Sequence, residues 1–191
     1  MLNGRLVFSA SLGWANRDRR IRVSRTTVFP IASITKAFTG VATLQAAASG
    51  RLDLDAPIQT YVPEFPVKPE LTITPRRLAA HRTGIRHWGN ERDGLFNRHF
   101  DRLGEIIPLF AGDSLRANAG IEYQYSSYGY NLLALAVGRA TATDFSHLVE
   151  RRIIAPLRLT RTRFDDARRP RPGRTRLYRS EEHTSELQSP I

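Results

Sequence analysis

The sequence predicts an α/β fold, because a strand pattern near the N-terminus precedes several helix patterns. Leu6, Phe8 and Leu12 alternate with smaller or polar residues, as in a strand with one buried face. Residues 33–49 are rich in alanine and hold no proline, which is typical of a helix. Of the 191 residues, 41% are hydrophobic, so the chain can bury the core of one domain or, at most, of two small ones.

The N-terminal third is predicted to hold a hairpin followed by the main helix. Residues 6–12 and 21–29 form the two expected strands, and a polar turn joins them. The helix over residues 33–49 ends at Gly50 and carries little charge, so we expect it to be buried on most sides. Residues 53–69 contain four prolines and are expected to be irregular.

The rest of the chain is predicted to be helices joined by long loops. A threonine followed by a proline predicts a short helix over residues 75–81. Residues 86–118 show weak periodicity and are expected to be loops with short helices. Residues 127–140 are apolar enough for a core helix, and Thr143 is expected to cap another helix that runs to Ile154.

Composition excludes several kinds of site. The chain has no cysteine, so disulfides, thiolate metal sites and cysteine nucleophiles are excluded, and its histidines lack the spacing of metal ligands. The sequence holds no apolar run long enough to span a membrane and no visible secretory signal, and it leaves the compartment open. His81 and His87 are expected to be turn and surface residues.

The net charge of +11 comes from 27 arginines and two lysines. Such a charge is compatible with nucleic-acid binding. The arginines are spread along the whole chain, however, and the densest cluster, at residues 168–176, has no interleaved aromatic residues for base stacking. The distribution therefore favours arginine-biased codon usage and solvated surfaces, and no nucleic-acid partner is expected.

Ser33 and Lys36 form a Ser-x-x-Lys motif at the start of the predicted main helix. This spacing places both side chains on one face of the first turn. A serine hydroxyl is a weak nucleophile until a base removes its proton, and a lysine can serve as that base. The alternative is a helix-capping serine followed by a lysine that faces solvent. Arginine, which cannot give up its proton, stands at 27 of the 29 basic positions, and the presence of a lysine here favours the catalytic interpretation.

Five segments, in order, resemble the class C β-lactamase-related serine hydrolases, a family that includes β-lactamases, D-Ala-D-Ala peptidases, esterases and mitochondrial β-lactamase-like proteases. They are FPIASITKAFT at residues 29–39, GRLDLDAPI at 50–58, HRTGI at 81–85, YSSYGYNLL at 125–133 and APLRL at 155–159. The resemblance covers roughly residues 4–178. It implies an antiparallel sheet flanked by helices, together with a helical lobe.

The resemblance also implies roles for four residues. Ser33 matches the acylated nucleophile, Lys36 its partner, and Tyr125 the tyrosine that acts as general base or relays protons. We expect Lys36 Nζ and Tyr125 Oη to converge on Ser33 Oγ at about 2.6–3.2 Å. Ser127 matches a substrate-binding position where class C enzymes usually carry asparagine, and the hydroxyl lacks the amide that helps to hold a β-lactam side chain.

The family's third motif, Lys-Thr-Gly or His-x-Gly on a core strand, does not follow the second in this sequence. In the family, that strand supplies the second N–H of the oxyanion hole, and losing one such donor typically costs about 10²–10³ in turnover. We therefore expect weak or no turnover from this chain, and exposed apolar surface around Leu6, Phe8 and the main helix, where the absent strands would pack.

The last residues differ from the rest of the chain. Residues 179–191 resemble the translation of a common short-read sequencing adapter, and three glutamates and one arginine replace the arginine-rich pattern. We expect residues 1–178 to be a partial domain, without its C-terminal strands and without a lead-in before Gly4, and residues 179–191 to be a non-native tail. The alternative is a genuine polar tail.

The resemblance implies a serine hydrolase that forms an acyl-enzyme on a small-molecule or peptide substrate, which is an amide, an ester or a β-lactam. It implies neither a metal nor an organic cofactor. The first alternative is an inactive scaffold with a structural or ligand-sensing role. The second is a basic nucleic-acid-binding protein.

Overall fold

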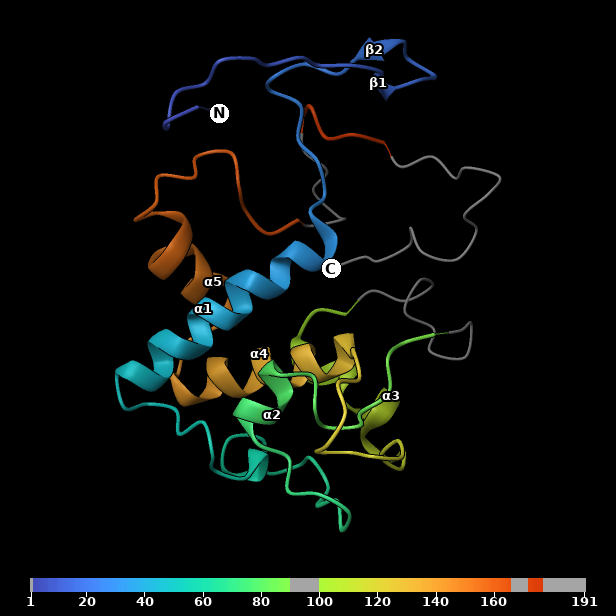
Figure 1. Ribbon diagram of the computed structural model, residues 1–191, viewed down its shortest axis with the longest axis vertical. Helices are drawn as coiled ribbons and strands as arrows, with labels where there is room; N and C mark the ends of the chain where they lie inside the picture. The colour runs from blue at the N-terminus through green and yellow to red at the C-terminus, as the bar shows by residue number, and fades with distance from the viewer. Residues whose placement is uncertain (1, 90–99, 166–171, 177–191) are drawn as a thin grey trace. The chain divides into compact units, whose positions relative to one another are not determined.

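The computed structural model describes residues 2–89, 100–165 and 172–176. The chain divides into two compact units, Met1–Ala32 with Phe164–Ile191, and Ser33–Arg163 (Figure 1). The predicted tail at residues 179–191 lies outside the described residues, as do residues 168–171 of the arginine-rich cluster.

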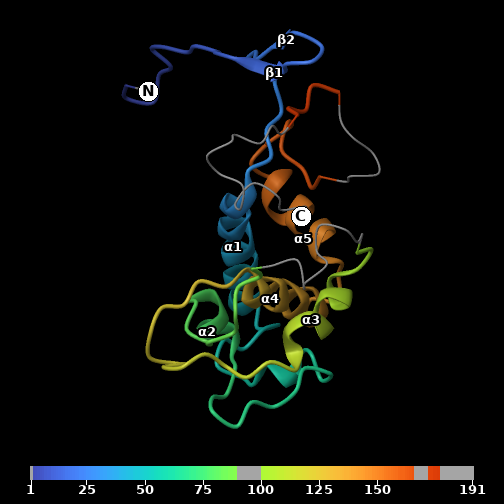
Figure 2. The same cartoon turned by 90° about the vertical axis from the view of Figure 1, so that its right-hand side faces the viewer.

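The first unit contains an antiparallel hairpin of two short strands, β1 (Trp14–Asn16) and β2 (Ile21–Arg22) (Figure 2). Trp14 pairs with Arg22, whose guanidinium lies 4.4 Å from the centroid of the indole ring. A second contact in this unit joins distant parts of the sequence, because Val28 forms an isolated parallel bridge with Arg174.

The predicted strand over residues 6–12 is wrong, and only Ile21–Arg22 of the second predicted strand is in a ladder. Alternation makes a strand only where a neighbouring strand supplies hydrogen bonds, and residues 6–12 have no such pairing in the described part of the chain. The expected exposure is confirmed, since Leu6 and Phe8 are 57% and 78% exposed.

The second unit is helical, and three of its helices pack together. They are α1 (Thr35–Ala48), α2 (Pro75–Ala79) and α4 (Ser127–Ala140). Both α1 and α2 contact α4 (Figures 1 and 2). The smaller elements are η1 (Ala32–Ile34), η2 (Ile58–Thr60), η4 (Leu103–Ile106), α3 (Pro108–Ala111), α5 (Phe145–Val149) and the π-helical turn η5 (Glu150–Ile154).

Helix α4 lies at the centre of the core of this unit. Its side chains of Tyr128, Leu132, Leu133 and Val137 are fully buried. They share the core with side chains from the loop before α2 and from α2 itself, namely Ile58, Val62, Phe65, Ile73 and Leu78. Fully burying one such side chain stabilises the fold by about 1.5–3 kcal/mol, so this core fixes α4 as the reference element for the site.

Helix α1 is buried on one face only, so the expectation that most of it would be buried is wrong. The residues on the buried face are Thr39, Ala42, Thr43 and Ala46. Ile34, Val41 and Leu44 are exposed. The low charge of this helix reflects small and apolar residues on both faces, and threonine hydroxyls on the buried face are satisfied within the helix, as when Thr43 Oγ1 donates to the carbonyl of Thr39 at 2.8 Å.

Local capping signals predicted the helix boundaries well. Thr74 caps α2 as expected, with its Oγ1 accepting from the amide of Arg77 at 3.3 Å. The bounds of α4 match the prediction. For α5, however, Asp144 is the cap and not Thr143, because the Thr143 hydroxyl donates to the carbonyl of Thr141.

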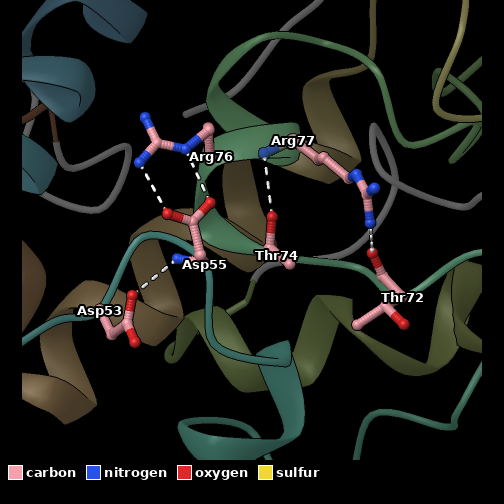
Figure 3. A network of polar contacts seen from close by, with 6 residues as sticks. All are labelled: Asp53, Asp55, Thr72, Thr74, Arg76 and Arg77. Carbon is pink, nitrogen blue, oxygen red and sulfur yellow. Dashed lines mark hydrogen bonds and ion pairs between the residues drawn. The ribbon is translucent and has the colours of Figure 1, made fainter.

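A polar network fastens the loop after α1 to α2 (Figure 3). Arg76 of α2 donates from Nε and Nη2 to the two carboxylate oxygens of Asp55, both at 2.7 Å. Asp53 accepts from the amide of Asp55, and Arg77 donates to the carbonyl of Thr72 at 2.7 Å. The Arg76 guanidinium lowers the pKa of Asp55 and outweighs the opposing effect of burial. The aspartates of the segment that follows α1 therefore order the chain at this point.

The turn after α2 is tied to the segment that leads into α4. Its carbonyls at Gly84, Arg82 and His81 accept from the amides of Arg116, Gly120 and Gln124, at 2.8, 2.8 and 2.7 Å. Gly84 has φ +70°, and a Cβ there would lie 2.8 Å from Ala119 Cβ. Only glycine satisfies both the backbone conformation and the close approach.

We predict that Gly84→Ala lowers the free energy of unfolding by about 2–4 kcal/mol, because it adds a strained φ and a steric clash. Gly40→Ala in α1 is the matched control. A Cβ at Gly40 meets no atom within 4 Å, so the free energy of unfolding of that variant should rise by about 0.5–1 kcal/mol. Urea denaturation measures the free energy of unfolding of both variants, and equal values would refute the prediction.

Candidate active site

Ser33 and Lys36 lie where the chain enters α1. Ser33 is in the turn η1 directly before the helix, and Lys36 is in its first turn. Ser33 does not cap the helix, because Ile34 is the N-cap residue and no side chain caps there. Lys36 is partly buried. The alternative of a capping serine followed by a solvent-facing lysine is therefore wrong.

Tyr125 and Ser127 lie where the chain enters α4. Between them, Ser126 is the N-cap residue, and its Oγ accepts from the amide of Gly129 at 2.9 Å and donates to the carbonyl of Arg86 at 2.8 Å. Tyr125 precedes this cap, and Ser127 is the first residue of the helix. Capping of α4 therefore also fixes the backbone from which both side chains extend.

The four side chains meet because α1 packs against α4. Ser33 Oγ and Tyr125 Oη form a 2.6 Å hydrogen bond. Lys36 Nζ donates to Ser33 Oγ at 3.2 Å and to Ser127 Oγ at 3.1 Å. It also lies 4.8 Å from the centroid of the Tyr125 ring. The convergence that the sequence predicts is thus present, and the chemical roles of these residues stay predictions.

The surroundings of Tyr125 lower the pKa of its hydroxyl. Burial raises the pKa of the phenol, but hydrogen bonds from Lys36, Ser33 and Ser127 and the charge of Lys36 outweigh burial, so the pKa lies below its ordinary value. Once deprotonated, a phenol oxygen in direct hydrogen bond with a serine hydroxyl can take the serine proton, and a lowered pKa makes that deprotonation easier.

Two histidines contact this cluster, and the sequence analysis did not assign either to the site. His81 is at the turn after α2, with φ +55°, as expected for a turn residue, but it is only 8% exposed. His87 is half-buried and does not lie on the surface as predicted. Burial, followed by the charge of Lys36, lowers the pKa of His81 to about 4 and also lowers that of His87. His81 belongs to the HRTGI segment, which could have indicated it, whereas nothing in the sequence pointed to His87.

The residues of the cluster suit acyl chemistry at a serine and do not form a metal site. Across residues 2–89, 100–165 and 172–176, no three His, Asp or Glu side chains lie close enough together to hold a metal ion. In the same residues, every helix is too short or too polar to cross a membrane.

Comparison with known proteins gives one matching family and several relatives. A family model described as Beta-lactamase matches residues 1–190. Protein flp of Staphylococcus aureus strain N315 is 33% identical over 165 residues, which cover 85% of this chain and 33% of flp. The human mitochondrial serine beta-lactamase-like protein LACTB is 28% identical, covering 75% of this chain and 39% of LACTB.

A solved structure supports a fold of the β-lactamase and penicillin-binding-protein type. The crystal structure of a penicillin binding protein from Bacillus halodurans superposes with a TM-score of 0.79 and 26% identity, covering 93% of this chain and 55% of that one. The chain spans about a third of the length of the curated relatives that it matches.

We predict that Lys36→Met raises the pKa of Tyr125, because it removes a hydrogen-bond donor and a positive charge. Ultraviolet difference titration of the phenolate measures this pKa, with Tyr125→Phe identifying the signal among the six tyrosines. Lys68→Met is the matched control, since Lys68 donates to the carbonyls of Ala111 and Asp113 and not to this cluster. A Tyr125 pKa that is the same in both variants would contradict the assignment.

We also predict that stability falls as the pH drops from 7 to 5. The unfolded chain protonates His81 near pH 6.5, whereas the folded protein does so only near 4, so the unfolded state binds more protons within this range. The loss is on the order of 1–2 kcal/mol for this residue. His81→Asn should show a smaller loss between the two pH values, as measured by chemical denaturation. An unchanged pH dependence in that variant would refute the prediction.

Proposed function

The chain belongs to the Beta-lactamase family, and from this premise we propose that it is a serine hydrolase that forms an acyl-enzyme at Ser33. The observation that carries the proposal is the 2.6 Å hydrogen bond between Ser33 Oγ and Tyr125 Oη, with Lys36 Nζ 3.2 Å from the same oxygen. A nucleophile, a proton acceptor and a neighbouring cation are the parts that acyl transfer to serine requires.

In the proposed reaction, Ser33 Oγ attacks the carbonyl carbon of the substrate while its proton passes to Tyr125 Oη. The tetrahedral intermediate collapses when the bond to the leaving group breaks, and Tyr125 returns the proton to the departing nitrogen or oxygen. Water then hydrolyses the ester on Ser33 by the same proton path in reverse. In this scheme Tyr125 accepts the proton as a phenolate, and Lys36 stabilises that phenolate by hydrogen bonding and charge.

The proposed substrate is an amide, an ester or a β-lactam. Two relatives support this range, since one is named a serine beta-lactamase-like protein and another a penicillin binding protein. Ser127 would contact the substrate from the start of α4, and its hydroxyl already accepts from Lys36. A hydroxyl offers one donor where asparagine would offer two, so we expect weaker retention of substrates with an amide side chain.

We predict that a fluorescent penicillin labels the chain covalently and that Ser33→Ala abolishes the label. Lys36→Met should slow labelling by about 10²–10³, the usual range for loss of one group that stabilises developing charge. Ser114→Ala removes an exposed serine outside the cluster and should label like the unchanged protein. Gel fluorescence gives the rate, and mass spectrometry of the digested adduct gives the site.

The same experiment separates the alternatives. No label on a chain whose circular dichroism shows folded helices would favour an inactive scaffold. A label that persists in Ser33→Ala would refute Ser33 as the nucleophile. An activated ester, assayed in parallel for product release, tells acylation alone from turnover.

A further inference from the structure

The backbone that carries Tyr125 and Ser127 is held by two side chains outside the reacting cluster. The amide of Ser126 donates to Nδ1 of His81, and the amide of Ser127 donates to Nδ1 of His87, each at 3.1 Å. These two amides are at the first turn of α4, where helix N–H groups have no partner within the helix. Two imidazoles thus satisfy consecutive amides beside the cluster.

The same two imidazoles enclose the ring of Tyr125. The His81 ring lies 4.6 Å from the Tyr125 ring and 4.7 Å from that of Tyr130, centroid to centroid. The His87 ring meets Tyr125 edge-on at 5.2 Å. A phenol held between two rings has few alternative rotamers, so its hydroxyl stays directed at Ser33.

We propose that His81 and His87 are positioning residues for the site, each holding one backbone amide so that Tyr125 and Ser127 both face Lys36. Neither imidazole touches the atoms that react in the proposed mechanism. Their effect is exerted through the backbone at the start of α4 and through packing against the Tyr125 ring. The effect on acylation rests on the proposed function, whereas the placement of Tyr125 does not.

The arrangement requires both imidazoles to be neutral, with the proton on Nε2, because Nδ1 accepts a hydrogen bond in each case. The groups that face them agree with this state. Lys36 from α1 and Arg116 from the loop before α4 bring positive charge. The rings that the structure places against the two imidazoles are uncharged: Tyr123, Tyr125 and Tyr130 beside His81, and Tyr125 and Trp88 beside His87. The positive end of the α4 dipole also disfavours an imidazolium at this place.

The test compares leucine and asparagine at position 87, where the side chain is only half-buried. Asparagine can place its Oδ1 near the position of Nδ1 and keep the acceptor, whereas leucine cannot. In His87→Leu, the pKa of Tyr125 should rise, because the phenol moves away from Lys36 and Ser33. In His87→Asn, it should stay near that of the unchanged protein. Ultraviolet difference titration reads this without any substrate.

Two further variants keep the test decisive. His147→Leu removes an exposed histidine on α5 and should leave the Tyr125 pKa unchanged. His81→Asn should preserve it as well, and asparagine there avoids placing a leucine in a buried polar site. Circular dichroism confirms that each variant is folded. A folded His87→Leu variant with an unchanged Tyr125 pKa would overturn the proposal. Asparagine variants in which the Tyr125 pKa rises as much as in His87→Leu would also overturn it.

The acylation rate with fluorescent penicillin is the second readout. We expect His87→Leu to be slower by about tenfold to a hundredfold, as for a misplacement of the reacting groups by about 1 Å, and His87→Asn to be within about threefold of the unchanged protein. If the unchanged protein is not labelled at all, the proposed function fails while the titration still decides the roles of the histidines. Equal acylation by the leucine variant and the unchanged protein would overturn the positioning role.

Discussion

The packing of α1 against α4 is the constraint on which the candidate site depends. Ser33 and Tyr125 are 92 residues apart in the sequence, and the contact between α1 and α4 brings the starts of the two helices together. Each helix start contributes a pair of side chains, and Lys36 bridges the two pairs. Because α4 is the more deeply buried helix, it serves as the frame, and the start of α1 with the preceding turn η1 places Lys36 and Ser33 against it.

The sequence predicted features that depend on neighbouring residues and missed features that depend on a distant partner. The cap at Thr74, the bounds of α4 and the irregular stretch after α1 follow from local chemistry of Thr, Pro, Ser and Gly. The prediction of a strand at residues 6–12 failed because alternating hydrophobicity indicates which face of a strand would be buried. It does not show that a partner strand lies beside it. The expectation that α1 would be buried on most sides failed for the same reason, since only one face of the helix is buried.

The site itself was predictable only in part. A spacing of three placed Ser33 and Lys36 on one helix face, and the resemblance to known serine hydrolases supplied Tyr125. His87 could not be found this way, because its role depends on how a loop returns to the end of a helix, and no local pattern encodes that return. A histidine at position 87 is compatible with many structures, and its hydrogen bond to the amide of Ser127 becomes visible only in the folded chain.

The arginines and the lysine of the site have different surroundings. Several arginines pair with carboxylates in the described part of the chain, among them Arg76 with Asp55, Arg86 with Asp113, Arg139 with Glu64, Arg174 with Asp165 and Arg176 with Asp18. Such partly exposed pairs contribute about 0–1 kcal/mol each and agree with arginines on solvated surfaces. The described partners of Lys36 are two hydroxyls and the faces of aromatic rings. No carboxylate is among these partners, so the positive charge of Lys36 acts on the neighbouring hydroxyls without being neutralised by them.

Tyr125, Ser126 and Ser127 are at the end of α4, and helix ends are where helices open first. Local opening of this turn would separate Tyr125 and Ser127 from Lys36, and the burial of Ser126, Ser127 and Tyr128 opposes that opening. Each acceptor that binds an amide of this turn shifts the opening equilibrium toward the closed form. Hydrogen exchange at the amides of Ser126 and Ser127 would therefore measure how often the four side chains of the cluster come apart.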